Sequence, residues 1–152
     1  MSVPTVVITK VLKDALSEDG YDVADYLVQF RDWKTDWNRR EYTFWFFGKD
    51  GENKFPLRDK KKVLSHVHLP PEIEAKSRDF WDKKFDDKGK KTSNTVLFYA
   101  GSAKLNRDLL LFVVTEPNGH DVQEMNTPDD NRLMNMLADQ AAAYIDTGEI
   151  YL

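Results

Sequence analysis

Leu109-Leu110-Leu111-Phe112-Val113-Val114 runs for six residues without a polar side chain. Such a run predicts a central strand that is covered on both faces. Val96 to Tyr99 (VLFY) predicts a second strand, and the residues from Ala100 to Arg107 predict a hairpin connection between the two. The two strands are therefore expected to be antiparallel neighbours, and they define the centre of the fold.

Outward from this hairpin, apolar periodicity predicts three more strands and three helices. The C-terminal helix has the clearest limits, because Thr127 is an N-cap residue, Pro128 suits the first turn and Gly148 suits the end. The expected strands are Thr5–Leu12, Tyr42–Phe47 and Leu64–Leu69, and the expected helices are Tyr21–Trp37, Pro71–Phe85 and Pro128–Thr147. This order predicts one α+β domain over residues 1–152: a mostly antiparallel sheet of four or five strands, with an N-terminal and a C-terminal helix packed on it.

Composition excludes several classes of protein. The chain has no cysteine, which excludes a disulfide scaffold, thiol chemistry and cysteine-ligated zinc. We see no signal peptide, and no apolar run approaches the roughly 18 residues of a membrane span. The sequence therefore predicts a cytoplasmic protein that does not enter the membrane.

Charge is unevenly distributed along the chain. The net charge is −4, yet residues 54–91 carry 12 Lys and Arg against 7 Asp and Glu. A local positive field can hold a polyanion even on an acidic protein, although a solvated lysine-rich surface gives the same count.

Two of the three histidines share one face of the predicted strand Leu64–Leu69. Alternation places His66 and His68 on one side and Val67 on the other. Histidine is the side chain suited to proton transfer near neutral pH. With His120, the pair also has the ligand count of a three-histidine metal site, although no spacing rule connects His120 to the other two.

Two further groups bear on chemistry. Lys90-Lys91-Thr92-Ser93-Asn94 is basic and rich in hydroxyl groups, so it is either a phosphate-binding segment or a solvated loop. Tyr99 is either a core residue or a proton donor. Imidazoles, lysines and a phenol near a basic segment are what a metal-independent ribonuclease needs. The reaction requires a base for the ribose 2′-OH, an acid for the 5′-oxygen and cations for the phosphate.

Several short motifs follow one another in a definite order. They are Phe47-Gly48-Lys49-Asp50, His66-Val67-His68-Leu69, Thr92-Ser93-Asn94 before Leu97-Phe98-Tyr99, Glu116-Pro117 with His120, and Asp129-Asp130-Asn131. In this order and spacing they resemble the YafO toxins. These are bacterial mRNA interferases of type II toxin–antitoxin systems, distantly similar to the RelE and ParE toxins.

The resemblance implies a RelE-like microbial RNase fold and a ribosome-dependent endoribonuclease that cleaves mRNA and inhibits translation. It implies a cognate antitoxin, the ribosome and mRNA as partners, and no cofactor or metal. On this reading, the candidates for proton transfer are His66, His68 and Tyr99, with His120 as a possible addition. The candidates for RNA or phosphate binding are Lys90, Lys91, Thr92, Ser93 and Arg107.

Two alternatives remain open at this level. The acidic net charge also suits a non-catalytic interaction protein on the same fold, which binds a protein partner or the translation machinery. A metal-dependent hydrolase that uses His66, His68 and His120 is the other alternative.

Overall fold

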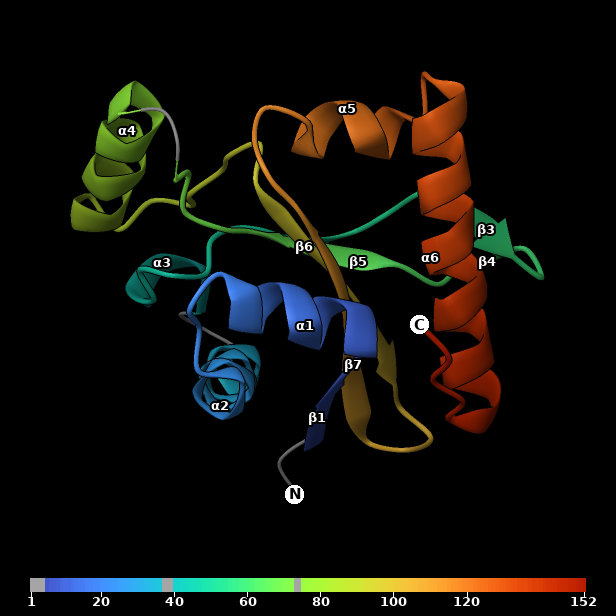
Figure 1. Ribbon diagram of the computed structural model, residues 1–152. Coiled ribbons are helices and arrows are strands. Elements are labelled where there is room, and N and C mark those ends of the chain that lie inside the picture. Colours follow the sequence, from blue (N-terminus) through green and yellow to red (C-terminus); the bar gives the residue numbers. More distant parts are fainter. Residues whose placement is uncertain (1–4, 37–39, 73–74) are drawn as a thin grey trace.

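A five-stranded mixed sheet forms the centre of the computed structural model, which describes residues 5–36, 40–72 and 75–152 (Figure 1). Its strand order is β1-β7-β6-β5-β2. The β1 strand is parallel to β7, and the other three neighbouring pairs are antiparallel. The α+β class is confirmed, but the sheet is mixed. The strands are β1 (Thr5–Ile8), β2 (Asp50–Glu52), β5 (Ser65–His68), β6 (Val96–Ser102) and β7 (Arg107–Val114).

The β6–β7 hairpin is the pair of strands that the apolar runs predicted. Leu109 and Leu111 belong to the core on one face of the sheet, and Leu110 belongs to the core on the other face. A strand buried on both sides needs apolar residues at successive positions, which is why Leu109–Val114 lacks polar alternation.

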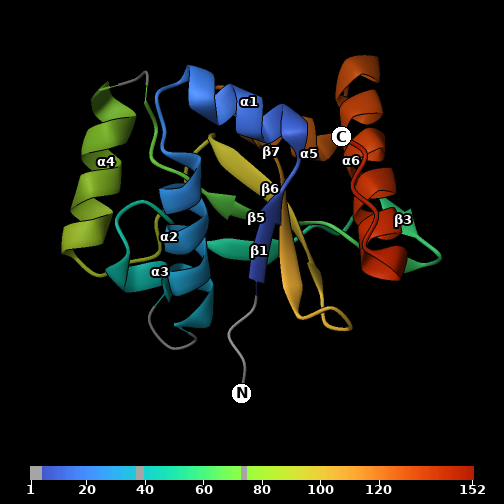
Figure 2. The ribbon, with the colours of Figure 1, turned by 60° about the horizontal axis from the view of Figure 1, so that its bottom comes forward.

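Helices cover both faces of the sheet (Figures 1 and 2). The helix α6 (Pro128–Thr147) packs on one face and begins after Thr127, whose side chain accepts a hydrogen bond from the Asp130 amide. It ends at Gly148, as predicted. The helices α1 (Lys10–Glu18) and α2 (Val23–Thr35) cover the other face. Within the described ranges, no helix is long and apolar enough to cross a lipid bilayer.

The first predicted strand is too long by four residues. Thr9 ends β1 because its hydroxyl donates to the Leu111 carbonyl oxygen and also caps α1 by accepting from the Leu12 amide. A side chain that caps a helix commits the next residues to helical geometry, so Leu12 lies in α1 rather than in a strand. The predicted helix Tyr21–Trp37 corresponds to α2, and Trp37 lies outside the described residues.

The predicted strand Tyr42–Phe47 is wrong. Its first two residues end the short helix α3 (Arg40–Thr43), and the next four form no regular structure. Phe47 is 1% exposed and packs against the rings of Phe30 and Trp33. Aromatic residues suit strands mainly because they pack on a half-buried surface, and here the same packing occurs without strand pairing.

The remaining elements lie at the two ends of β5. The helix α4 (Ala75–Asp86) begins after the predicted start at Pro71, and α5 (Gly119–Glu124) precedes α6. The strands β3 (Leu57–Arg58) and β4 (Lys61–Lys62) form a separate hairpin beside α6. In Figures 1 and 2 this hairpin and α4 lie on opposite sides of the molecule. The lysines and arginines of residues 54–91 therefore do not form one continuous surface.

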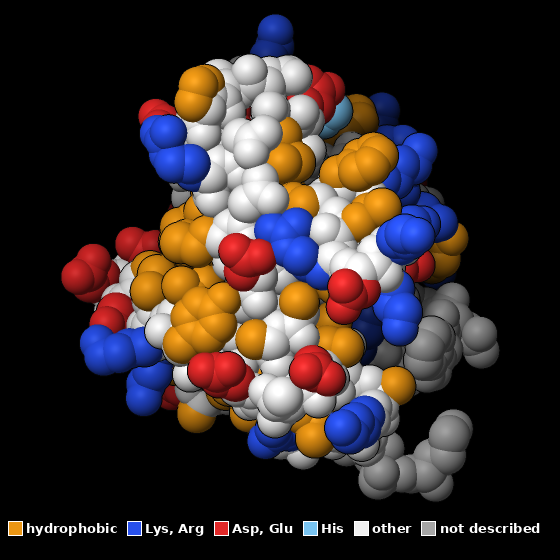
Figure 3. All heavy atoms as spheres, turned by 90° about the vertical axis from the view of Figure 1, so that its right-hand side faces the viewer, with side chains coloured by type: hydrophobic (Ala, Val, Ile, Leu, Met, Phe, Trp, Pro, Cys, Tyr) orange, Lys and Arg blue, Asp and Glu red, His pale blue; other side chains and the backbone are white. Residues whose placement is uncertain are grey.

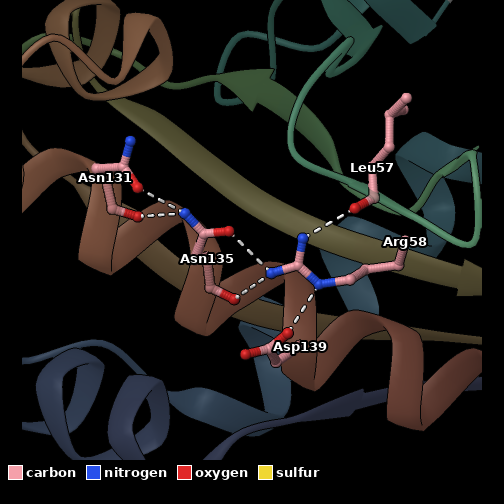
Figure 4. A network of polar contacts seen from close by, with 5 residues as sticks. All are labelled: Leu57, Arg58, Asn131, Asn135 and Asp139. Atoms are coloured by element: carbon pink, nitrogen blue, oxygen red, sulfur yellow. Dashed lines mark hydrogen bonds and ion pairs between the residues drawn. The ribbon is translucent and has the colours of Figure 1, made fainter.

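Arg58 fastens the small hairpin to α6 (Figure 4). Its Nε donates to an Asp139 carboxylate oxygen at 2.7 Å, and another guanidinium nitrogen donates to the Asn135 side-chain oxygen at 2.9 Å. A third nitrogen donates to the Leu57 carbonyl oxygen, so the planar fork contacts both the hairpin and the helix. On the face of the molecule around this network, acidic and basic side chains are interspersed (Figure 3).

Candidate functional site

The two histidines of β5 lie side by side, as the alternation predicted. Their ring centroids are 5.5 Å apart with an interplanar angle of 79°. Val67 between them is fully buried in the core on the other face of the sheet. His66 pairs with Gly51 of β2 and with Phe98 of β6, so its backbone lies inside the sheet.

A chain of side-chain amides fixes the His66 ring. Asn53 Nδ2 donates to Gln123 Oε1 at 3.1 Å, which turns Asn53 Oδ1 toward His66 Nδ1 at 2.8 Å. An amide oxygen only accepts, so the Nδ1 of His66 carries the proton and its neutral ring keeps a lone pair on Nε2. The chain also connects β5 to α5, because Gln123 lies on α5, where its Nε2 donates to the Gly119 carbonyl oxygen of the same helix.

The backbone of Ser93 holds the ring of His68. His68 Nδ1 lies 2.8 Å from the Ser93 carbonyl oxygen and 3.1 Å from the Ser93 amide nitrogen. The Ser93 hydroxyl donates to the Leu69 carbonyl oxygen at 2.6 Å, which fastens the loop to the end of β5. Because Nδ1 is engaged with the loop, Nε2 is the nitrogen of His68 that is available for chemistry.

Burial keeps both imidazoles neutral at pH 7. It lowers the pKa of His66 to about 4, with a smaller contribution from the neighbouring His68. Burial also lowers the pKa of His68, against the hydrogen bond to Ser93, which raises it. A neutral imidazole accepts a proton, so both rings have the protonation state of a general base.

His68 opens into a cleft of about 670 Å³ between α4 and α5. His68 and the Thr92-Ser93-Asn94 loop both line it, and Ser93 contacts His68 and Leu69, so the predicted hydroxyl-rich segment does meet the histidine strand. His120 of α5 lines the same cleft, and its Nε2 lies 2.8 Å from Glu124 Oε1. The other lining residues are Lys76, Ser77, Phe80, Glu116, Pro117 and Gln123.

The predicted phosphate-binding lysines lie away from the cleft. Lys91 is fully buried, and its Nζ donates to the Glu41 carbonyl oxygen at 3.2 Å and lies 5.5 Å from the centroids of the Trp81 and Phe85 rings. Burial lowers the pKa of Lys91 to about 8. Lys90 Nζ lies 3.2 Å from a carboxylate oxygen of Glu41.

Tyr99 does not join the histidines either. It is 2% exposed and belongs to the core that contains Val67, on the opposite face of the sheet from His66. Its hydroxyl donates to the Asp50 carboxylate and accepts from Lys34 Nζ at 2.7 Å. The predicted set of His66, His68 and Tyr99 is therefore not one cluster.

Arg107 lies at the far end of the hairpin. It pairs with Ser102, whereas His68 pairs with Val96, which in turn pairs with Val114. Seven residues of strand separate Arg107 from Val114, roughly 23 Å.

The three histidines do not form a metal-ligand set. Among residues 5–36, 40–72 and 75–152, no three His, Cys, Asp or Glu side chains come together in a way that holds a metal ion. The Nδ1 of His66 is engaged with Asn53, and His66 does not line the cleft that His68 and His120 share. The alternative of a three-histidine hydrolase site gains no support from this geometry.

Comparison with known protein families identifies the chain. A family model described as toxin YafO of a type II toxin–antitoxin system matches residues 31–146. The chain belongs to the YafO toxin family. This family membership implies an antitoxin partner for the chain. The match spans both histidines of β5 and every residue that lines the cleft, whereas β1 and α1 lie outside it. No curated protein and no solved structure matches the chain.

Sequence reasoning missed four residues that line this cleft of the YafO-family toxin, Lys76, Ser77, Phe80 and Gln123, and it also missed Asn53 beside His66. Asn53 and Gln123 are 70 residues apart, and nothing in their local sequence indicates that they meet behind His66. Lys76 and Phe80 do carry a local signal, because they lie four residues apart and therefore share one face of α4. Only the fold shows that this face borders the cleft.

Burial of neutral His66 makes the stability of this toxin depend on pH. Between about pH 4 and 6.5, the unfolded chain binds a proton at this ring and the folded chain does not, so acidification favours unfolding. We expect the free energy of unfolding to fall by about 2 kcal/mol from pH 7 to pH 5 through this ring. Urea unfolding of wild type and His66→Gln at both pH values measures it, because the variant lacks this contribution. Equal losses in the two proteins would contradict the prediction.

Proposed function

We propose that this YafO-family toxin is a ribosome-dependent endoribonuclease that cleaves mRNA and thereby inhibits translation, and that its antitoxin holds it silent. One observation supports this most directly. The neutral ring of His68 is anchored through Nδ1 and borders an open cleft that a second histidine, His120, also lines. A fixed base and a second proton-transfer group in one cleft suit RNA cleavage by the 2′-hydroxyl.

In this proposal His68 Nδ1 carries the ring proton and donates to the Ser93 carbonyl oxygen, so the lone pair on Nε2 removes the proton from the ribose 2′-OH. The 2′-oxygen attacks phosphorus, the bond to the 5′-oxygen breaks, and His120 donates a proton to that leaving oxygen. The products are a 2′,3′-cyclic phosphate and a 5′-hydroxyl. His66 is a positioning residue, because its ring packs at 79° to that of His68 and is itself fixed by Asn53.

The charge of the cleft supports dependence on the ribosome. Of the lysines and arginines in the described part of the chain, only Lys76 lines the cleft, and Glu116 lines it too. One lysine offsets little of the charge that develops on a pentavalent phosphate. We infer that the ribosome positions the mRNA and supplies the missing stabilisation, with Thr92 and Asn94 contacting the phosphate. Lys90, Lys91, Arg107 and Tyr99 are not part of this proposal because of where they lie.

Purified toxin added to ribosomes programmed with a defined mRNA tests the proposal. We expect cleavage within the ribosome-bound stretch, with 2′,3′-cyclic phosphate or 3′-phosphate ends, and little cleavage of the same mRNA without ribosomes. The antitoxin-free toxin is expected to arrest growth on induction. Growth arrest with intact mRNA would instead favour a non-catalytic interaction protein, the alternative that the net charge of −4 also suits.

A further inference from the structure

One face of α4 carries a phenylalanine between two lysines. Lys76, Phe80 and Lys84 are spaced by four residues, so their side chains follow one another along a single stripe of the helix. Lys84 Nζ lies 5.6 Å from the centroid of the Phe80 ring. Lys76 and Phe80 both line the cleft into which His68 opens.

Packing does not explain the position of Phe80. The core contact of α4 is Trp81, which is fully buried and donates from Nε1 to the Trp45 carbonyl oxygen. Phe80, in contrast, is 52% exposed. It is the only Phe, Tyr or Trp side chain that lines the cleft in the described ranges. The exposed Phe80 ring, beside lysines at the border of a candidate RNA-cleavage site, is therefore suited to bind a ligand.

We propose that Phe80 stacks a base of single-stranded RNA while Lys76 and Lys84 contact the phosphates on either side of it. The inference rests on the proposed function, because it assigns the RNA strand that is delivered to His68. Bases stack on aromatic rings with little sequence preference, and lysines neutralise phosphates without reading sequence. The site is thus a sequence-tolerant anchor that fixes the position of the strand along the cleft.

The surroundings of the Phe80 ring suit stacking with a base of single-stranded RNA. Lys84 Nζ lies near the ring, and Phe80 as a residue is about half exposed to solvent beside the cleft. A duplex hides the faces of its bases, so only an unpaired strand reaches such a ring. A base held on α4 places the neighbouring sugar and phosphate toward the floor of the cleft, where His68 and Thr92 lie.

A fluorescence titration of the full-length toxin with a short single-stranded RNA that contains 2-aminopurine tests the stacking. We expect wild type to quench the fluorescence, and Phe80→Ala to lose the quenching and bind roughly 5- to 150-fold more weakly. Phe80→Trp should retain both, and Phe80→Leu should lose the quenching. Phe55 is 63% exposed and lies next to the β3–β4 hairpin, so Phe55→Ala is the matched control and should bind as wild type.

An RNA with an abasic site in place of the 2-aminopurine separates stacking from other effects. Wild type should bind the abasic RNA as weakly as Phe80→Ala binds the intact RNA. Phe80→Ala should bind the abasic RNA with no further loss of affinity. The inference is overturned if Phe80→Ala binds intact RNA like wild type. A ring that contacts only a protein partner would give this same result, because its removal would leave the RNA affinity unchanged. RNA binding does not require cleavage, so the two proposals can fail separately. If the toxin quenches the fluorescence but leaves mRNA intact on ribosomes, the nuclease activity is rejected and the stacking site is retained.

Discussion

His68→Ala is expected to reduce mRNA cleavage on programmed ribosomes by about 10²- to 10⁴-fold, the range typical for loss of a general base. Of the two histidines of β5, only His68 lines the cleft, and its Nδ1 is fixed by the Ser93 backbone. His66 does not line the cleft, and its contact with Asn53 holds the ring where it is, so we expect it not to replace His68. Single-turnover cleavage of a 5′-labelled mRNA measures the rate.

The control must separate lost chemistry from lost structure. Urea unfolding and circular dichroism show whether His68→Ala keeps the fold, and added imidazole is expected to restore part of the rate by entering the space that the ring leaves. A matched variant on the same face, His66→Gln, is expected to lose less activity because it removes a positioning residue. A folded His68→Ala protein that cleaves like wild type would sink the assignment of this ring as the base.

Gly48→Ala is expected to destabilise the fold by about 3 kcal/mol or more. A Cβ at this position would lie 2.3 Å from the Lys91 carbonyl oxygen and 2.7 Å from the Trp81 ring. Both neighbours are fixed, because Lys91 accepts from the Lys49 amide at 2.8 Å and Trp81 is fully buried. The backbone at Gly48 would have to move away from the backbone at Lys91. Urea unfolding measures the resulting loss in the free energy of unfolding.

The same substitution is expected to reduce cleavage at temperatures where the protein still folds. The segment that would move continues directly into the Thr92–Ser93 loop, which holds His68. Gly89→Ala is the matched control in the segment before Thr92, because its Cβ would meet Cδ of the flexible Lys84 side chain at 3.3 Å and the Lys84 carbonyl oxygen at an ordinary contact distance of 3.6 Å. Equal stability of Gly48→Ala and Gly89→Ala would contradict the close approach.

The sequence predicted the parts of the fold that local pattern determines. The β6–β7 hairpin, the limits of α6 and the shared face of His66 and His68 follow from apolar runs, from caps at Thr127 and Gly148, and from strand alternation. The strand predicted at Tyr42–Phe47 was wrong because Phe47 is buried by packing against Phe30 and Trp33 of α2, without strand pairing.

The candidate site was harder to predict because distant contacts build it. The burial of Lys91 depends on Trp81, Phe85 and the Glu41 backbone, none of which its own polar segment indicates. The tautomer of His66 depends on a contact between Asn53 and Gln123. The separation of Tyr99 from the histidines does follow from register, since Tyr99 pairs with Ser65, one residue out of phase with His66.

The parallel pairing of β1 with β7 determines how late the sheet can be completed during protein synthesis. The Thr9 hydroxyl donates to the Leu111 carbonyl oxygen, a contact that spans 102 residues. Contacts of such separation form late, because the intervening chain must close a long loop first. A ribosome that adds about 5 to 20 residues per second therefore releases β1 at least several seconds before its partner strand. For most of that interval the nascent toxin lacks β6 as well as β7, so the sheet that carries His66 and His68 is assembled only when most of the chain has been translated.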